Sequence, residues 1–500
     1  MNTKLTIRSV RAGTLRTLGG VGVALGTLVF MAACSDFFNV PNTNQPNLED
    51  LVSNPTKTKL EAAATGIFAT ARTGIQSYIW RLGSLGREGI NLSGNNQPDY
   101  SEPYFGPLQS TGFGGSQWTD RYQNIRNINV FLDALARIDT AALSNKDKAG
   151  GRAMANTLKA LAFTYVILTR DTLGAPVDVD QPITAGPAPF VTKDSVYGYI
   201  LTLLDSAQAD LARADTVLAD TLVKFFFSLP PGFSGFDKPA TFRLFNRALA
   251  AKAEVLRASA AGCGATCYDR AITALTGSFL VANSAQFGLG VSFDFSTGSG
   301  DITNGLSEPL NGVTFFAHPS DSADARLQPG GQPDQRVINK IAPKQGAPQQ
   351  LGGIPGISGT QKFTVYFTAG QDDPGHSIPI IRNEELILLD AEAQWFRTGP
   401  NKLQAISDIN LVRQGAGGLA VTTVTVASPD SDFVKELIYN RRYSLLWEQG
   451  TRWIDARRFN RLGDIINAVP TFPNVPRVMP IPKGECDRRG LGDNCQPPRS

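Results

Sequence analysis

Four carboxylates lie close together on one predicted helix, and they are the residues in this sequence best placed to do chemistry. Glu385 and Glu392 are seven residues apart and share one helix face, and two facing carboxylates are what a glycosidase needs at a sugar bond. Nearby segments, however, supply enough arginines to neutralise these acids in ion pairs between helices. We therefore favour a structural role over catalysis. The carboxylates are Glu384, Glu385, Asp390 and Glu392, and the arginines are Arg382, Arg413, Arg441, Arg442 and Arg452.

Other catalytic and metal-binding patterns are absent from the sequence. It contains no GxSxG nucleophile elbow, no HExxH zinc motif and no Walker loop. The only histidines, His318 and His376, lie far along the chain from the closely spaced pair Cys263 and Cys267, so a zinc site there lacks nitrogen ligands. We therefore expect no enzyme activity, no metal site and no cofactor.

Aromatic side chains among polar residues are the best candidates for ligand binding. A sugar ring presents flat apolar C–H faces that Tyr or Trp can cover, while Asn, Asp and Arg bind its hydroxyl groups. Such residues gather in and just before a Gly-rich segment, 83–115, and again in a second loop-like segment, 284–378. Each ring taken alone could instead anchor its loop to the scaffold. The candidate ligand residues are Tyr78, Trp80, Asn96, Asp99, Tyr100, Tyr104, Phe315 and Phe316.

The amino terminus predicts export and a lipid anchor. A basic start without acids precedes an apolar run of roughly 15 residues, shorter than the about 20 that span a bilayer. Small residues then stand directly before Cys34, a pattern that resembles a bacterial lipobox, in which the peptide is cut before the cysteine and the cysteine is acylated. We expect 1–33 to be a cleaved signal peptide, Cys34 the lipid attachment site and 34–48 a tether. An ordinary signal peptide with a chance cysteine is the alternative.

Without the signal peptide the chain is nearly neutral. The sequence has 47 Lys and Arg against 44 Asp and Glu, and four of the basic residues lie in 1–33, which leaves 43 against 44. No basic excess attracts a polyanion, so we expect no nucleic-acid partner.

Four cysteines remain after the anchor, and they form two pairs that are close in sequence: Cys263 with Cys267, and Cys486 with Cys495. In an exported protein an even remainder favours disulfides. Four cysteines allow three connectivities, and the two local bridges are the easiest to form. We expect these local disulfides.

Three amphipathic helical segments follow one another between residues 381 and 459. In the last of them, apolar residues such as Leu437 and Leu445 recur at helical spacing, and Arg441 and Glu448 fall on the same face. Charged residues on a packing face are expected to be partly buried and paired. We predict structural ion pairs at Glu392, Arg441, Glu448 and Arg452.

The residue pattern of this block resembles that of the SusD/RagB family of outer-membrane nutrient-binding lipoproteins. It matches the family's R-x-x-E-x-x-L-x-x-A-E-A motif from Arg382, its I-N-x-x-R motif from Ile409 and its closing R-x-x-D-x-x-R motif from Arg452. Weaker matches cover 118–176 and 191–211. Asn440 stands where the family usually has an acid, and Gln414 where it usually has an arginine.

The resemblance implies a mainly α-helical fold of tetratricopeptide-like helix pairs, with loop-rich insertions at about 83–115 and 284–378 and few short strands. It implies a single domain over 49–485, followed by a tail, 486–500. It further implies a lipid-anchored protein of the outer membrane, on the cell surface. Such a protein captures oligomeric nutrients, with a glycan favoured over a peptide, and delivers them to a SusC-like TonB-dependent transporter. A tetratricopeptide-type adaptor that binds only proteins and a surface hydrolase are the alternatives.

Overall fold

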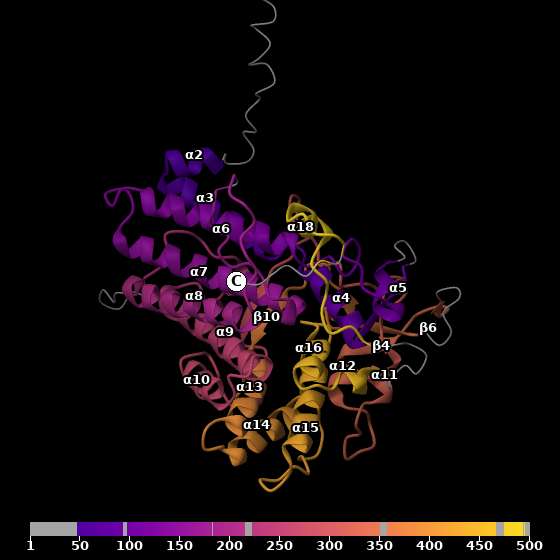
Figure 1. Cartoon of the computed structure of the whole chain (residues 1–500). Helices are drawn as coiled ribbons and strands as arrows, with labels where there is room; N and C mark the ends of the chain where they lie inside the picture. The colour runs from indigo at the N-terminus through magenta and orange to yellow at the C-terminus, as the bar shows by residue number, and fades with distance from the viewer. Residues whose placement is uncertain are drawn as a thin grey trace, which may run out of the picture. The chain divides into compact units, whose positions relative to one another are not determined.

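The computed structural model describes residues 48–93, 98–182, 184–215, 223–350, 358–466, 475–493 and 495 (Figure 1). The chain divides into two compact units, Met1–Asp50 and Leu51–Ser500. The elements below belong to the second unit, except that α2 (Leu48–Ser53) begins before the division. Two predicted site residues, Cys34 and Asn96, lie outside the described residues.

A series of long helices forms the scaffold, and each member packs against the next one in the series (Figure 1). The members are α3 (Lys57–Ala71), α6 (Thr119–Arg137), α7 (Asn145–Arg170), α8 (Lys193–Ala214), α9 (Pro239–Ala260), α10 (Ala265–Thr276), α13 (Asn383–Phe396) and α14 (Lys402–Gly415). A further helix, α15 (Asp430–Ser444), packs against both α13 and α14. The prediction of a mainly α-helical scaffold of paired helices is confirmed.

Local sequence explains where several of these helices begin and how closely they pack. Thr56, Ser144 and Thr192 are N-cap residues, and each side-chain oxygen accepts a hydrogen bond from the backbone N–H three residues later. In α9, Ala248 and Ala251 are fully buried. Their small side chains let the backbones of neighbouring helices approach closely, so the alanine-rich stretch is a packing feature.

Short helices and strand pairs complete the unit. The helices are α4 (Ile75–Gly86), α5 (Pro98–Phe105), α11 (Pro319–Ala323), α12 (Gln335–Lys340), α16 (Thr451–Arg458), α17 (Leu462–Ile466) and α18 (Lys483–Arg488), with 3-10 turns η1 (Asp171–Leu173), η2 (Pro231–Phe233) and η3 (Ser284–Gln286). The antiparallel strand pairs are β1 (Gly89–Asn91) with β3 (Phe315–Ala317), β2 (Gly290–Phe293) with β10 (Ile378–Arg382), β4 (Ile341–Pro343) with β7 (Gln361–Phe363), β5 (Gln349–Gln350) with β6 (Ser358–Gly359), and β8 (Phe367–Thr368) with β9 (Gln371–Asp372). The expectation of few, short strands is confirmed.

The β1–β3 pair joins the two aromatic segments that the sequence singled out. Asn91 is opposite Phe315, and Gly89 is opposite Ala317. At Gly89 a Cβ atom would lie 2.1 Å from the ring of Trp447, so only glycine allows this close approach. The β1–β3 pairing therefore holds the segment after α4 against the segment 284–378, and both segments pack against the C-terminal part of the chain.

The predicted continuous helix through Glu448 is wrong. Helix α15 ends at Ser444, and α16 begins at Thr451 after a turn in which Trp447 and Gly450 have φ angles of 61° and 63°. A Cβ atom at Gly450 would lie 2.2 Å from the Cβ atom of Leu82, so the turn fits tightly against α4. Apolar spacing alone did not reveal this break, because the residues on both sides of it are buried.

Both local cysteine pairs are bonded in the structure. The Cα atoms of Cys263 and Cys267 are 5.6 Å apart, and those of Cys486 and Cys495 are 5.7 Å apart. These separations are ordinary for a disulfide. The first bridge links the end of α9 to α10, and the second fastens the chain beyond α18.

Candidate functional site

Four of the predicted ligand residues lie in the interior, which corrects the sequence analysis. Tyr78, Trp80, Tyr104 and Phe316 are only 1%, 7%, 2% and 0% exposed. The Tyr78 ring packs edge-to-face against Tyr165, with ring centroids 4.9 Å apart. The Tyr104 hydroxyl donates to the Gly89 carbonyl at 3.1 Å, and burial raises the pKa of Tyr104 to about 12. These rings are part of the packed scaffold.

The physical reason for this correction is regular structure within the supposed loops. Tyr104 belongs to helix α5, which the Gly- and Pro-rich composition of 83–115 concealed. Phe316 belongs to strand β3, where successive side chains point to opposite faces, so it is buried while its neighbour Phe315 is partly exposed.

The other described candidates, Asp99, Tyr100 and Phe315, are partly exposed, and the buried Trp80 packs against one of them. The ring centroids of Trp80 and Phe315 are 5.9 Å apart. The Arg81 guanidinium lies 4.7 Å from the Trp80 ring centroid, and its Nη2 atom is 3.5 Å from Oδ1 of Asp99. Tyr100, next to Asp99 on α5, is half-buried. We call Trp80, Arg81, Asp99, Tyr100 and Phe315 the aromatic site.

A set of buried aromatic rings supports the aromatic site. Phe113 packs edge-to-face against Trp80 with centroids 5.7 Å apart, and Trp447 packs against Phe315 at 5.8 Å. Phe363 in turn stacks on Trp447 at 4.2 Å. These contacts hold Trp80 and Phe315 in place before any ligand arrives, which reduces the entropy that binding must remove.

The chemistry of the aromatic site suits a polyhydroxylated ligand. The partly exposed rings of Tyr100 and Phe315 offer apolar surface, and the Arg81–Asp99 pair supplies a donor and an acceptor. At 3.5 Å this pair is at the limit of a hydrogen bond, so both groups keep capacity for hydroxyl groups of a ligand. Burial lowers the pKa of Arg81, and attraction to Asp99 opposes that shift. Sequence reasoning missed Arg81, although its position beside Trp80 was a usable signal.

The predicted ion-pair residues are all buried, with partners that sequence did not specify. Glu448 accepts from Nε of Arg382 and from Nζ of Lys340, both at 2.8 Å. Burial acts to raise the pKa of Glu448, but attraction to these two cations prevails and lowers it to about 2. Arg441 does not contact Glu448; its Nε donates to Asp455 at 2.7 Å.

Glu392 and Arg452 have separate sets of hydrogen-bond partners. Arg458 donates to both carboxylate oxygens of Glu392, and the Tyr268 hydroxyl donates to Oε1 at 3.0 Å. The Arg452 backbone N–H donates to Glu88 at 2.9 Å, and its guanidinium donates to the Arg87 carbonyl at 2.9 Å. Burial raises the pKa of Glu88 to about 7. These contacts join α16 to α4, α10 and α13.

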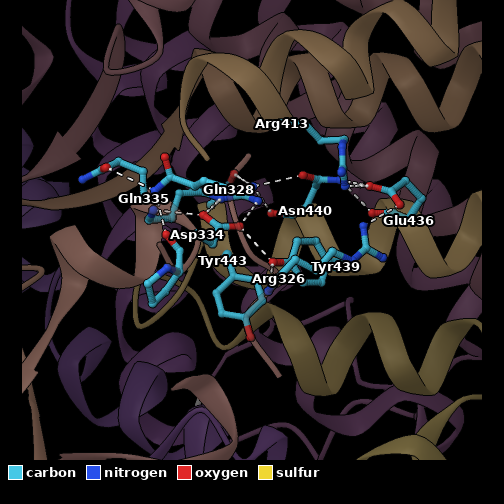
Figure 2. A network of polar contacts seen from close by, with 12 residues as sticks. Arg326, Gln328, Asp334, Gln335, Arg413, Glu436, Tyr439, Asn440 and Tyr443 are labelled. Carbon is cyan, nitrogen blue, oxygen red and sulfur yellow. Dashed lines mark hydrogen bonds and ion pairs between the residues drawn. The ribbon is translucent and has the colours of Figure 1, made fainter. Parts of the chain in front are cut away.

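A further network of ion pairs and hydrogen bonds connects the segment 284–378 to α14 and α15 (Figure 2). Glu436 forms ion pairs with Arg413 and, at 2.7 Å, with Arg326, while Asn440 donates to the same carboxylate at 2.9 Å. The Asn440 carbonyl oxygen accepts from Arg336, which pairs with Asp334 at 2.7 Å. Asn440, the departure from the family pattern, therefore bridges two ion pairs.

The four carboxylates considered for catalysis have structural partners. Glu384 pairs with Arg382, and Glu385 pairs with Lys252 at 2.9 Å. Asp390 lies against Asp408 of α14, and burial, together with the charge of Asp390, raises the pKa of Asp408 to about 8. Glu392 is bound by Arg458.

Neither a cluster of potential metal ligands nor a membrane-spanning helix is found among the described residues. Within them, no three or more His, Cys, Asp or Glu side chains gather in a way that could hold a metal ion. In the same part of the chain, no helix combines the length and the apolar character needed to cross a membrane.

No protein-family model and no curated protein matches the sequence. Solved structures do match over most of its length. A SusD homologue from Bacteroides thetaiotaomicron is 14% identical, with a TM-score of 0.62 over 90% of this chain and 99% of that one. A laminarin-binding SusD-like protein is 15% identical, with a TM-score of 0.57 over 88% of this chain and 99% of its own. B. fragilis NanU is 14% identical, with a TM-score of 0.60 and coverage of 90% and 98%. At such identities the likeness concerns the fold.

Proposed function

Because this chain has the SusD fold, we propose that it is an outer-membrane lipoprotein that binds oligosaccharides at the cell surface and delivers them to a SusC-like TonB-dependent transporter. It binds its ligand without cleaving it. The lipid is attached at Cys34, and the tether 34–48 connects it to the folded chain. The likeness to a laminarin-binding protein supports a glycan over a peptide.

The aromatic site is the observation that carries the choice of ligand. It combines the partly exposed rings of Tyr100 and Phe315 with a guanidinium–carboxylate pair, and the buried rings of Trp80 and Trp447 pack against Phe315. A sugar needs apolar surface beside hydroxyl-binding groups, which is the combination present here.

The double variant Tyr100→Ala/Phe315→Ala tests this site. Each stacked ring contributes about 1 kcal/mol to ligand binding, so the affinity for the best glycan of an oligosaccharide panel should fall 10- to 100-fold in calorimetric titration. The control variant Phe287→Ala removes an equally half-buried ring far from Trp80 in sequence and should bind like the wild type. Unchanged affinity in the double variant would place the ligand elsewhere.

The anchor and the partner have their own test. Cys34→Ala should release the protein from the membrane fraction, because no described helix can span a bilayer. The wild type, solubilised from its native membrane, should co-purify with a TonB-dependent transporter. Membrane retention of Cys34→Ala would refute the lipid anchor, and a stable complex with other proteins alone would favour an adaptor.

A further inference from the structure

A second concavity, separate from the aromatic site, opens between α3, α7, the loop around η2 and the strand β2. Its volume is about 300 Å³, which is at the lower end of small-molecule pockets. Its base is apolar and comes from four segments: Phe68, Leu158, Phe233 and Phe293 are each at most 5% exposed. Phe68 and Phe233 pack edge-to-face with centroids 5.1 Å apart, so the base is firmly packed.

The rim of this pocket is open to solvent. Thr65 and Ala69 border it from α3, and Pro231 borders it from the opposite side. All three are exposed. A small molecule could therefore reach the phenylalanine base without any movement of the scaffold.

One end of the pocket carries a net negative charge. The charged lining residues are Arg72, Asp294 and Asp301, one cation and two anions. Arg72 is already committed, because it pairs with Asp301 and donates to the backbone carbonyl of Asp294 at 2.5 Å.

Asp294 keeps an open acceptor. Its Oδ2 atom accepts from the Gly232 backbone N–H at 2.6 Å, and no described side chain donates to its Oδ1 atom. Partial burial raises the pKa of this carboxyl group, although the Gly232 N–H and the charge of Arg72 oppose that shift.

We propose that this pocket binds a small apolar primary amine, with its hydrocarbon body on Phe68, Phe233 and Phe293 and its ammonium group at Asp294. The base consists of hydrocarbon side chains that offer no hydrogen bond to hydroxyl groups, so it favours an apolar body over a polyhydroxylated one. The surplus negative charge excludes a carboxylate. A protonated arylalkylamine satisfies both requirements, because it buries a ring and brings one charged donor to the open oxygen.

Three probes that share one hydrocarbon body test the assignment by calorimetric titration: 2-phenylethylamine, 2-phenylethanol and 3-phenylpropanoate. At neutral pH the amine should bind at least about 10-fold more tightly than the alcohol, and the carboxylate should bind most weakly. Equal affinity for all three, or no binding of the amine at millimolar concentration, would overturn the proposal.

Variants locate the binding. Ala69→Trp fills the rim and should abolish amine binding, whereas Ala62→Trp adds the same bulk at another exposed alanine of α3 and should leave it unchanged. Asp294→Asn should weaken the amine about 10-fold and leave the alcohol unaffected, because it removes the charge alone. Amine binding that survives both Ala69→Trp and Asp294→Asn would contradict the proposed site. Asp294→Asn remains a valid test even if the tryptophan at position 69 disturbs α3.

Discussion

Glu448→Gln removes one charge from the most tightly paired carboxylate of the C-terminal block. Glu448 is 5% exposed and is shared by Arg382 and Lys340. Its two cationic partners lower its pKa from the ordinary 4.5 to about 2, which corresponds to about 3 kcal/mol of stability at neutral pH. Glutamine has nearly the same shape, so the loss reflects two buried cations that keep their desolvation cost. The free energy of unfolding should therefore fall by about 3 kcal/mol.

The pH dependence gives this prediction its sign. A carboxylate with a lowered folded-state pKa stabilises the protein fully above its ordinary pKa of 4.5, and this contribution disappears as the pH falls through about 2. The difference between wild type and Glu448→Gln should be constant from pH 5 to 7. It should then shrink between pH 4.5 and pH 2, as the wild-type carboxyl group takes up its proton.

Denaturant unfolding followed by tryptophan fluorescence measures both quantities, because Trp447 adjoins Glu448 in the chain. A matched control is Asp133→Asn, which removes an exposed ion pair with Arg137 and should change stability by less than about 0.5 kcal/mol. If Glu448→Gln also changes stability by less than about 0.5 kcal/mol, the carboxylate does not hold Arg382 and Lys340 together. A difference that persists unchanged below pH 2 would refute the electrostatic reasoning.

Four further variants test other parts of the structure. Burial raises the folded-state pKa of Asp408 to about 8, so the stability of the folded state decreases as the pH rises toward 8 and this carboxyl group loses its proton. Asp408→Asn should therefore raise the free energy of unfolding by at least about 1 kcal/mol relative to wild type between pH 5 and 9, as measured by denaturant unfolding. Tyr104→Ala should destabilise by about 3 kcal/mol because this ring is buried, whereas the melting curve of Tyr100→Ala should stay close to wild type; the reverse order would contradict the placement of α5. Gly450→Ala should cost about 2 kcal/mol or more, since the residue has a φ of 63° and faces Leu82; wild-type stability would exclude the tight turn.

The helical scaffold was predictable because its signals are local. Apolar spacing identified the segments from residue 381 onward, and N-cap residues such as Ser144 mark where helices begin. The burial of charged residues on α13 and α16 was also predictable, since arginines and acids recur on faces that must pack. Their partners were not predictable, because Arg382 and Lys340 reach Glu448 from distant parts of the chain.

The candidate site was only partly predictable, since composition does not tell which ring of a loop faces solvent. Trp80 and Phe315 were named from their surroundings, but their approach depends on the β1–β3 pairing between segments more than 200 residues apart. Tyr104 and Phe316 lie in segments of the same composition as those of Trp80 and Phe315. They are buried because they belong to a short helix and a short strand. Arg81 acquires its role only through its contacts with Trp80 and Asp99.

Calorimetric titration of the purified wild-type protein with an oligosaccharide panel that includes laminarin fragments, followed by chromatography of the recovered ligand, tests the central claim most directly. We predict saturable binding of at least one oligosaccharide, with micromolar affinity lost in Tyr100→Ala/Phe315→Ala, and recovery of the ligand intact. Failure to bind any glycan of the panel would contradict the proposed function. Recovery of shortened products would show that the protein cleaves its ligand, which would contradict the claim that it binds without chemistry.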